Sequence, residues 1–139
     1  MLGLDPRLLA AAGYDRRRLA GVVGLAGPYD FLPVTGNDIK PVFAPAGDGP
    51  LSQPVSYVDG LNPPMLLLAG DADTTVNPRN TLSLAEKVRA AGGRVEAWLL
   101  PGIGHIGIVT AFEPLFRSRA PVLDEVWAFI TRQRDARTR

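Results

Sequence analysis

Residues 65–78 constrain the fold more than any other part of the sequence, because a short apolar run there ends abruptly in charged residues. The run from Met65 to Ala69 is followed by Gly70 and by two carboxylates, Asp71 and Asp73. Continuous apolar runs of this length are typical of strands buried on both faces of a parallel sheet, and such strands deliver polar side chains to its carboxyl edge. The segment therefore predicts an α/β fold with a functional site where this strand ends.

Two further apolar runs, residues 21–26 and 94–100, predict two more strands. Between the central strand and the last one, Asn77 is a good N-cap and Gly92 a good stop signal, so a helix is predicted between them. A final helix begins near Pro121. This order of elements predicts a mostly parallel, three-stranded sheet with flanking helices.

The apolar residues of the two predicted helices indicate which faces are buried. In the first helix, the apolar face comprises Leu82, Ala85 and Val88, with Leu84 and Ala91 offset by one position. In the final helix, a single apolar stripe comprises Val122, Leu123, Val126, Trp127 and Ile130. We expect Trp127 and Phe129 to lie in the core or next to it.

Residues 1–14 leave two interpretations open. They are either the tail of a helix whose first turns are missing, or a short helix that begins after Asp5 and Pro6. Gly13 ends the helix in both cases. Three consecutive arginines, residues 16–18, come next, and such a cluster is more often a solvated surface than a binding patch.

His105 is the only histidine of the chain, and it follows the last predicted strand through the glycine-bracketed loop 101–104. A crossover between the two strands places their carboxyl ends side by side, so a carboxylate and the imidazole can meet there. Such a pair is two thirds of a catalytic triad. Spacing alone does not decide between Asp71 and Asp73, and either aspartate or the histidine can instead be a loop residue bonded to backbone.

Residues 32–64 are rich in proline, glycine and serine and show no sustained periodicity. Long irregular segments inside compact domains are often lids or binding segments, so a lid-like excursion is predicted, with short helical pieces at 38–43 and 52–58. Ser52 and Ser56 are candidate nucleophiles by residue type. Neither lies in a strand–Gly-x-Ser-x-Gly–helix context, which favours a turn or cap role for both.

Composition excludes several kinds of site. The 15 basic and 14 acidic residues give a net charge of +1, which offers no support for nucleic-acid binding. The absence of cysteine excludes thiolate nucleophiles and cysteine-ligated metals, and a single histidine argues against a histidine-rich metal site. No glycine-rich phosphate loop follows the first strand, which argues against a nucleotide or flavin binder. We therefore predict no metal and no cofactor.

Length and hydropathy predict a single domain over residues 1–139 that does not enter a membrane. The 139 residues are about the length of one average domain. The apolar runs are far shorter than the ~20 residues of a membrane-spanning helix, and the N-terminus lacks the layout of a signal peptide. A cytoplasmic location is the expectation.

Taken together, these segments resemble the C-terminal half of an α/β-hydrolase of the esterase and lipase group, which includes carboxylesterase-like, feruloyl-esterase-like and kynurenine-formamidase-like members. The motif at 66–76 matches the family's acid at Asp73, and the motif at 101–105 matches its histidine at His105. The resemblance implies a partial α/β-hydrolase fold in which these two residues are catalytic.

Residues 27–31 are similar to the segment that follows the strand before the lid in these enzymes. The resemblance therefore also implies substrate contacts at Tyr29, Phe31 and Ile106. It implies a small-molecule ester or amide as the substrate, with no metal and no cofactor in the reaction.

The sequence departs from the family pattern at the nucleophile. The family's serine belongs in a Gly-x-Ser-x-Gly elbow that precedes the acid and the base, and no such motif occurs here. Residues 1–13 resemble the helix that follows the elbow. We therefore expect this chain to be a C-terminal fragment of a serine carboxylic-ester or amide hydrolase. We also expect it to be inactive alone, because loss of the nucleophile lowers turnover on the order of a million-fold.

Two consequences follow for partners and function. The first strand is expected to leave an open sheet edge, through which the chain self-associates or binds the missing N-terminal half. The alternative function is a non-catalytic remnant or interaction module that keeps half of an α/β sheet.

Overall fold

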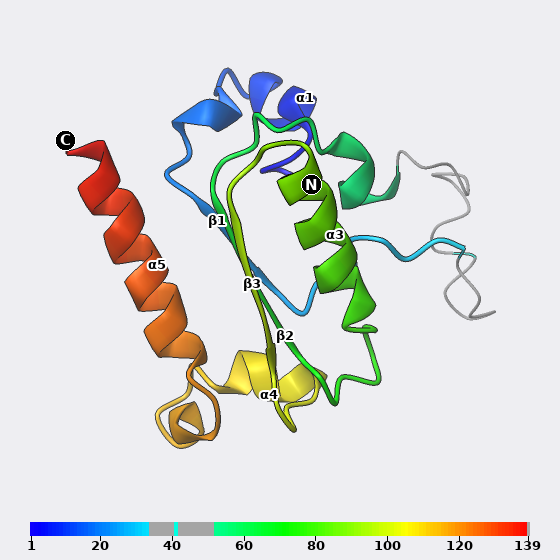
Figure 1. The fold of residues 1–139 in the computed structure, drawn as a ribbon, viewed down its shortest axis with the longest axis vertical. Helices are drawn as coiled ribbons and strands as arrows, with labels where there is room; N and C mark the ends of the chain where they lie inside the picture. The colour runs from blue at the N-terminus through cyan, green and yellow to red at the C-terminus, as the bar shows by residue number, and fades with distance from the viewer. Residues whose placement is uncertain (34–40, 42–51, 139) are drawn as a thin grey trace.

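The computed structural model describes residues 1–33, 41 and 52–138. Three parallel strands form one sheet in the order β1 (Val22–Leu25), β2 (Met65–Gly70) and β3 (Val95–Leu100). Helices α3 and α5 lie on opposite sides of this sheet (Figure 1). The predicted α/β class, with a parallel sheet and flanking helices, is confirmed.

The remaining elements are helices and 3-10 turns that precede, connect or follow the strands. In chain order they are α1 (Pro6–Ala10), η1 (Arg16–Arg18), η4 (Pro54–Tyr57), α3 (Arg79–Ala90), α4 (His105–Thr110), η5 (Arg117–Arg119) and α5 (Val122–Arg137). Because α3 connects β2 to β3, the carboxyl ends of these two strands lie side by side as predicted.

The central strand β2 is buried along its whole length. Its side chains alternate between two apolar clusters. On the α3 side, Met65 and Leu67 pack with Leu84 and Val88, and on the α5 side, Leu66 and Leu68 pack with Ile108, Val122 and Phe129. A strand with apolar partners on both faces has no polar side, which explains its unbroken apolar sequence.

The buried face of α3 differs from the predicted one by one position. Leu84, Ala85 and Val88 are fully buried, whereas Leu82 is 48% exposed. Ala91 lies beyond the helix and is exposed. The apolar residues of this helix cover a wide arc, so periodicity alone did not locate the part of the arc that faces the sheet.

The predicted stripe of α5 proves to be two stripes. Val122 and Phe129 are buried, as expected for Phe129, and they face the sheet. Leu123, Trp127 and Ile130 form a neighbouring stripe that is exposed, with 66% of Trp127 accessible. The expectation that Trp127 lies in the core or next to it is therefore wrong, because the helix turns that stripe away from β2.

At the N-terminus, the structure shows the second of the two interpretations. Helix α1 starts directly after Asp5, whose carboxylate accepts a hydrogen bond from the backbone N–H of Arg7 at 3.0 Å. This is an N-cap bond, which satisfies a helix donor that has no partner inside the helix. Gly13 follows with φ of +73°, in the left-handed region that favours glycine.

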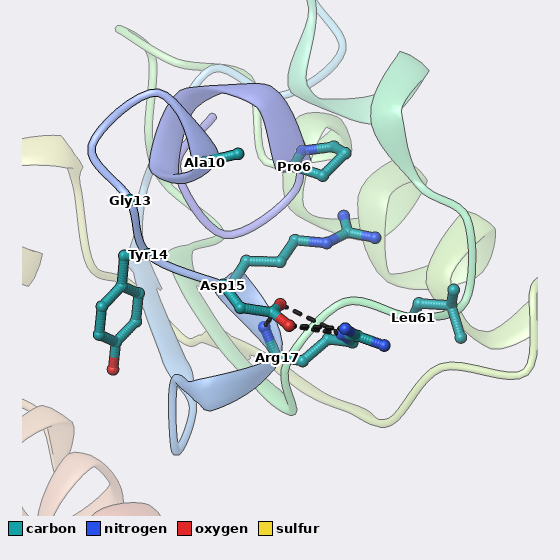
Figure 2. A pocket seen from close by; sticks show the side chains of 8 residues that line it. Pro6, Ala10, Gly13, Tyr14, Asp15, Arg17 and Leu61 are labelled. Carbon is teal, nitrogen blue, oxygen red and sulfur yellow. Dashed lines mark hydrogen bonds and ion pairs between the residues drawn. The ribbon is translucent and has the colours of Figure 1, made fainter.

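A cavity lies near the amino ends of the strands. It has a volume of about 430 Å³ and lies between α1, η1 and Leu61 (Figure 2). Figure 1 places α1 at the opposite end of the sheet from α4. The residues that line the cavity are Pro6, Ala10, Gly13, Tyr14, Asp15, Arg16, Arg17 and Leu61.

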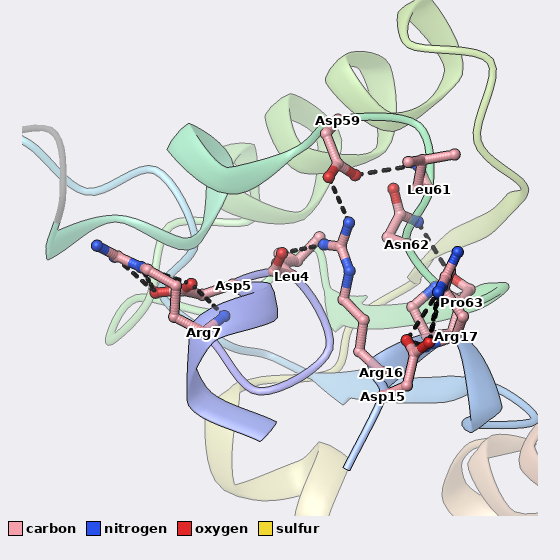
Figure 3. Close-up of polar contacts among 10 residues, drawn as sticks. All are labelled: Leu4, Asp5, Arg7, Asp15, Arg16, Arg17, Asp59, Leu61, Asn62 and Pro63. Atoms are coloured by element: carbon pink, nitrogen blue, oxygen red, sulfur yellow. Dashed lines mark hydrogen bonds and ion pairs between the residues drawn. The ribbon is translucent and has the colours of Figure 1, made fainter. Parts of the chain in front are cut away.

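One of the three consecutive arginines is buried beside this cavity, contrary to the expectation of a solvated cluster. Arg16 is 4% exposed, and its guanidinium donates to the carbonyl of Leu4 and to the carboxylate of Asp59 (Figure 3). A guanidinium can leave water only when its donors find such partners. Arg17 follows the expectation, since it pairs with Asp15 at the surface.

Strand β1 is less covered than β2. Its residues are only half-buried, and among the described residues it pairs with β2 alone. An edge of this kind presents unpaired backbone donors and acceptors to a further strand.

Most of the predicted excursion at 32–64 lies outside the described residues, including nearly all of the helical piece expected at 38–43. The described part contains η4, which corresponds to the helical piece predicted at 52–58. A lid role for this excursion and the division into a single domain stay predictions.

Within the described ranges, no helix is both long and apolar enough to cross a bilayer. The cytoplasmic location stays a prediction.

The two faces of α3 give a direct test of the packing. Leu84→Ala should lower the free energy of unfolding by about 2–5 kcal/mol, because it leaves a cavity in the α3-side cluster. Leu82→Ala, on the exposed face of the same helix, should change it by less than about 1 kcal/mol. Urea denaturation of both variants measures the difference, and equal losses would contradict the assigned face.

Candidate active site

The loop after β2 holds Asp73 in a buried position. The Asp73 side chain has no exposed surface, and its Oδ1 accepts hydrogen bonds from the backbone N–H groups of Thr75 and Val76, both at 2.8 Å. Its other oxygen, Oδ2, lies 2.8 Å from Nδ1 of His105. One carboxylate therefore both closes its own loop and contacts the imidazole.

The hydrogen bonds set the charge state of Asp73. Burial by itself raises the pKa of a carboxyl group, because it disfavours the charged form. Here the bonds from the amides of Val76 and Thr75, together with the contact to His105, outweigh burial and hold the pKa of Asp73 below its ordinary value of 3.8. At neutral pH Asp73 is a carboxylate, so Nδ1 of His105 carries the hydrogen and donates it.

His105 is the first residue of α4 and follows Gly104, an N-cap residue with extended backbone. Its side chain is 29% exposed. With Nδ1 bonded to Asp73, Nε2 is the ring nitrogen that can exchange a proton. The pair thus has the geometry of an oriented general base.

The second aspartate has a different task. Asp71 is exposed, and its Oδ1 accepts a hydrogen bond at 2.7 Å from the backbone N–H of Gly102, in the loop that leads to His105. The structure thus resolves the choice that spacing left open: Asp73 contacts His105, while Asp71 ties the two loops together. Both carboxylates contribute to the same arrangement.

A glycine in β2 allows the His105 loop to approach. A Cβ atom added to Gly70 would lie 1.8 Å from the carbonyl oxygen of Ile103, so only glycine fits under this loop. The same carbonyl accepts a bond from the N–H of Ala72 at 3.2 Å. Within the loop itself, Gly104 has only an ordinary contact, whereas Gly102 is needed for its φ of +68°.

Gly70→Ala should therefore displace the His105 loop. We expect a loss of about 1–3 kcal/mol in the free energy of unfolding, because a methyl group would collide with backbone that cannot rotate away. Gly104→Ala is the matched control, since its new methyl group would lie 3.7 Å from the nearest atom. Chemical denaturation compares the two, and a neutral Gly70→Ala variant would show that the loop does not cross β2 this closely.

The lowered pKa of Asp73 predicts how stability depends on pH. A group whose pKa is lower in the folded state stabilises the fold above its unfolded value, here 3.8, and this contribution is lost as the pH falls through the folded value. The stability advantage of the natural protein over Asp73→Asn should thus be full above about pH 5 and shrink below about pH 4. Thermal melts between pH 3 and pH 7 measure it, and an advantage that grows toward pH 3 would contradict the assignment.

Tyr29, a predicted substrate contact, packs against β1. A Cβ atom at Gly24 would lie 2.2 Å from its hydroxyl oxygen, and one at Gly27 would lie 2.6 Å from its ring, so these two glycines make room for Tyr29. Burial raises the pKa of the Tyr29 hydroxyl. The structure thus places this side chain with the α3-side cluster, and substrate contact by Tyr29 stays a prediction.

The other two predicted contacts lie nearer the surface. Phe31 is half-buried in the segment that follows Tyr29. Ile106 comes directly after His105 on α4 and is 70% exposed, and Val109, one turn later, is 58% exposed. Substrate contact by Phe31 and Ile106 stays a prediction.

No group of three or more histidine or acidic side chains suited to a metal occurs in the part of the chain that the structure describes.

Comparison with known proteins gives a family match. Residues 50–135 match the prolyl oligopeptidase family. This stretch is more than half of the 139 residues, and it contains Asp73 and His105. A comparison with curated proteins gives no significant match.

Solved structures resemble the fold. A truncated form of a carbohydrate esterase from gut microbiota is 25% identical, with a TM-score of 0.65 over 83% of this chain and 42% of its own. The esterase Est2 of Thermogutta terrifontis with propionate bound is 16% identical, with a TM-score of 0.60 over 85% of this chain and 45% of its own. The carboxylesterase Cest-2923 of Lactobacillus plantarum WCFS1 is 16% identical, with a TM-score of 0.60 over 79% and 40%.

This chain therefore spans less than half the length of these three esterases. Their fold agrees with the predicted partial α/β-hydrolase arrangement, and the predicted resemblance is confirmed.

Proposed function

The chain belongs to the prolyl oligopeptidase family of α/β-hydrolases, and from this premise we propose that it supplies the acid and the base of a serine carboxylic-ester hydrolase. The observation that carries the proposal is the 2.8 Å contact between His105 and the fully buried carboxylate of Asp73. The esterase relationship of the fold favours an ester over an amide as the substrate. An amide, which the same chemistry cleaves, is the alternative to be tested.

In this proposal His105 acts as general base and then as general acid. Nε2 takes the proton of a serine hydroxyl as its oxygen attacks the ester carbonyl, and it later gives that proton to the leaving alcohol. Asp73 keeps the ring in the required tautomer and stabilises the imidazolium that forms. Its low pKa suits this role, because Asp73 stays ionised while His105 changes charge.

The serine is proposed to come from outside this sequence, which contains no Gly-x-Ser-x-Gly motif. The open edge of β1 is where we propose that the nucleophile-bearing part pairs, since β1 is half-buried and bonds to β2 on one side. In isolation, the same edge is proposed to bind a second copy of the chain. The proposed substrate contacts are Tyr29, Phe31 and Ile106.

A second candidate function is a non-catalytic interaction module that keeps the half-sheet. The observation that favours it is the missing nucleophile motif. The genomic frame upstream of Met1 separates the two functions. A Gly-x-Ser-x-Gly segment encoded there in frame supports the hydrolase, and a stop codon preceding a ribosome-binding site supports the module.

Kinetics of the chain joined to that upstream segment test the hydrolase directly. Hydrolysis of p-nitrophenyl acetate should require the joined protein, since the 139 residues alone lack a nucleophile. Asp73→Asn should lower kcat by about 10³–10⁴-fold, because the amide favours the wrong tautomer of His105. His105→Ala should lower it by on the order of 10⁶-fold.

Asp71→Asn provides the matched control. An asparagine Oδ1 can still accept the hydrogen bond from Gly102, so kcat should stay within about 10-fold of the natural value. Activity that survives His105→Ala would contradict the proposed role of His105. An equal loss of kcat in Asp71→Asn and Asp73→Asn would contradict the proposed role of Asp73.

A further inference from the structure

Residues 29–32 form neither helix nor strand, so their backbone N–H groups need partners from elsewhere. The first two are bonded by one side chain: Oδ1 of Asn80 accepts from the N–H groups of Tyr29 and Asp30 at 2.9 and 2.7 Å. The amide is oriented this way because its Nδ2 donates to the carbonyl of Asn77 at 3.1 Å. Asn80 is buried, with 7% of its surface exposed.

A second side-chain amide bonds the other two N–H groups. Oε1 of Gln53 accepts from the N–H groups of Phe31 and Leu32 at 2.7 and 3.0 Å, and Gln53 is 8% exposed. Gln53 lies directly before η4, which packs against α3. Two buried oxygens thus bond four consecutive backbone donors, and we call the side chains of Asn80 and Gln53 the amide clamp.

Asn80 also connects this segment to the loop of the acid. Its backbone N–H and its side chain both donate to the carbonyl of Asn77. The residue before Asn77 is Val76, whose N–H donates to the carboxylate of Asp73. Hydrogen bonds on either side of the Val76–Asn77 peptide link therefore connect the Asp73 loop with residues 29–30, so the two segments lie beside one another.

We propose that Asn80 and Gln53 are positioning residues of the hydrolase, whose amide clamp holds residues 29–32 as a fixed wall of the ester-binding site beside the Asp73 loop. This inference rests on the proposed function. It adds that substrate binding depends on the clamp, whereas proton transfer at His105 does not.

Hydrogen exchange tests the Asn80 half of the clamp without reference to catalysis. In the full-length polypeptide as it is encoded, Asn80→Ala should speed exchange of the Tyr29 and Asp30 amides by about 100-fold. Asn80→Asp keeps an acceptor oxygen but replaces the Nδ2 donor with a second oxygen that faces the carbonyl of Asn77, so both amides should exchange faster than in the natural protein and more slowly than in Asn80→Ala. Ser83→Ala, which removes a bond to the carboxylate of Asp30 but none to a backbone N–H, is the matched control and should leave both amides slow.

The Gln53 half is tested in the same way. Gln53→Ala should speed exchange at Phe31 and Leu32 by about 100-fold and affect the two preceding amides less, while Gln53→Glu should restore slow exchange. Exchange that is unchanged in both alanine variants, or that rises equally across all amides of the protein, would overturn the clamp.

Kinetics of the joined protein test the positioning role. With p-nitrophenyl acetate, Asn80→Ala should raise KM by about 10-fold, change kcat by less than about threefold, and leave the pH profile of kcat in place. Asn80→Asp, which keeps the acceptor oxygen but loses the donor to Asn77, should raise KM by less than Asn80→Ala does. A fall in kcat with a displaced pH profile would overturn the inference. If the joined protein without substitutions does not hydrolyse the ester, the proposed function is contradicted. The hydrogen-exchange rates would then still show whether the amide clamp exists.

Discussion

The burial of β2 on both faces is the constraint on which the rest of the structure depends. Each face of the strand forms the centre of one apolar cluster, so α3 on one side and α4 and α5 on the other are placed by the same six residues. A charged side chain cannot enter this strand without a large desolvation cost. The first position that tolerates one lies after Gly70, at the carboxyl edge, and this is where the two aspartates occur.

The arrangement at this edge depends on two carboxylates with separate tasks. Asp71 is exposed and holds the loop that leads to His105, by accepting a hydrogen bond from Gly102. Asp73 is buried and accepts hydrogen bonds from the backbone N–H groups of Thr75 and Val76. The exposed residue fixes where the loop lies, and the buried one fixes how the imidazole is turned. Because Asp73 receives backbone bonds independently of His105, its position does not require the histidine to be in place.

The sequence was sufficient for features that depend on local pattern. The apolar run of β2 and the cap and stop signals around α3 predicted the elements that the structure shows, and the order of these elements predicted where Asp73 and His105 could meet. Features that depend on contacts between distant segments were not accessible. The role of Gly70 depends on the backbone of Ile103, and the exposed stripe of α5 depends on which side of the helix meets the sheet.

Buried amides such as Asn80 and Gln53 are hidden from sequence analysis for a related reason. Their residue types are usually exposed, and nothing near them in sequence marks the backbone donors, 21 to 51 residues away, that make their burial favourable.

The order of the strands in the sheet indicates where the segment that carries the proposed nucleophile would lie. The sheet order β1–β2–β3 follows the chain order, so each strand is added on the same side of the previous one. Sequential strands in such sheets are usually neighbours, and a strand that precedes β1 in the chain is therefore expected beside β1. The acid and the base lie on the loops after β2 and β3, so a nucleophile after that preceding strand would complete a row along one edge of the sheet, in the order nucleophile, acid, base. The proposed strand would pair with the edge of β1 that has no partner strand among the described residues.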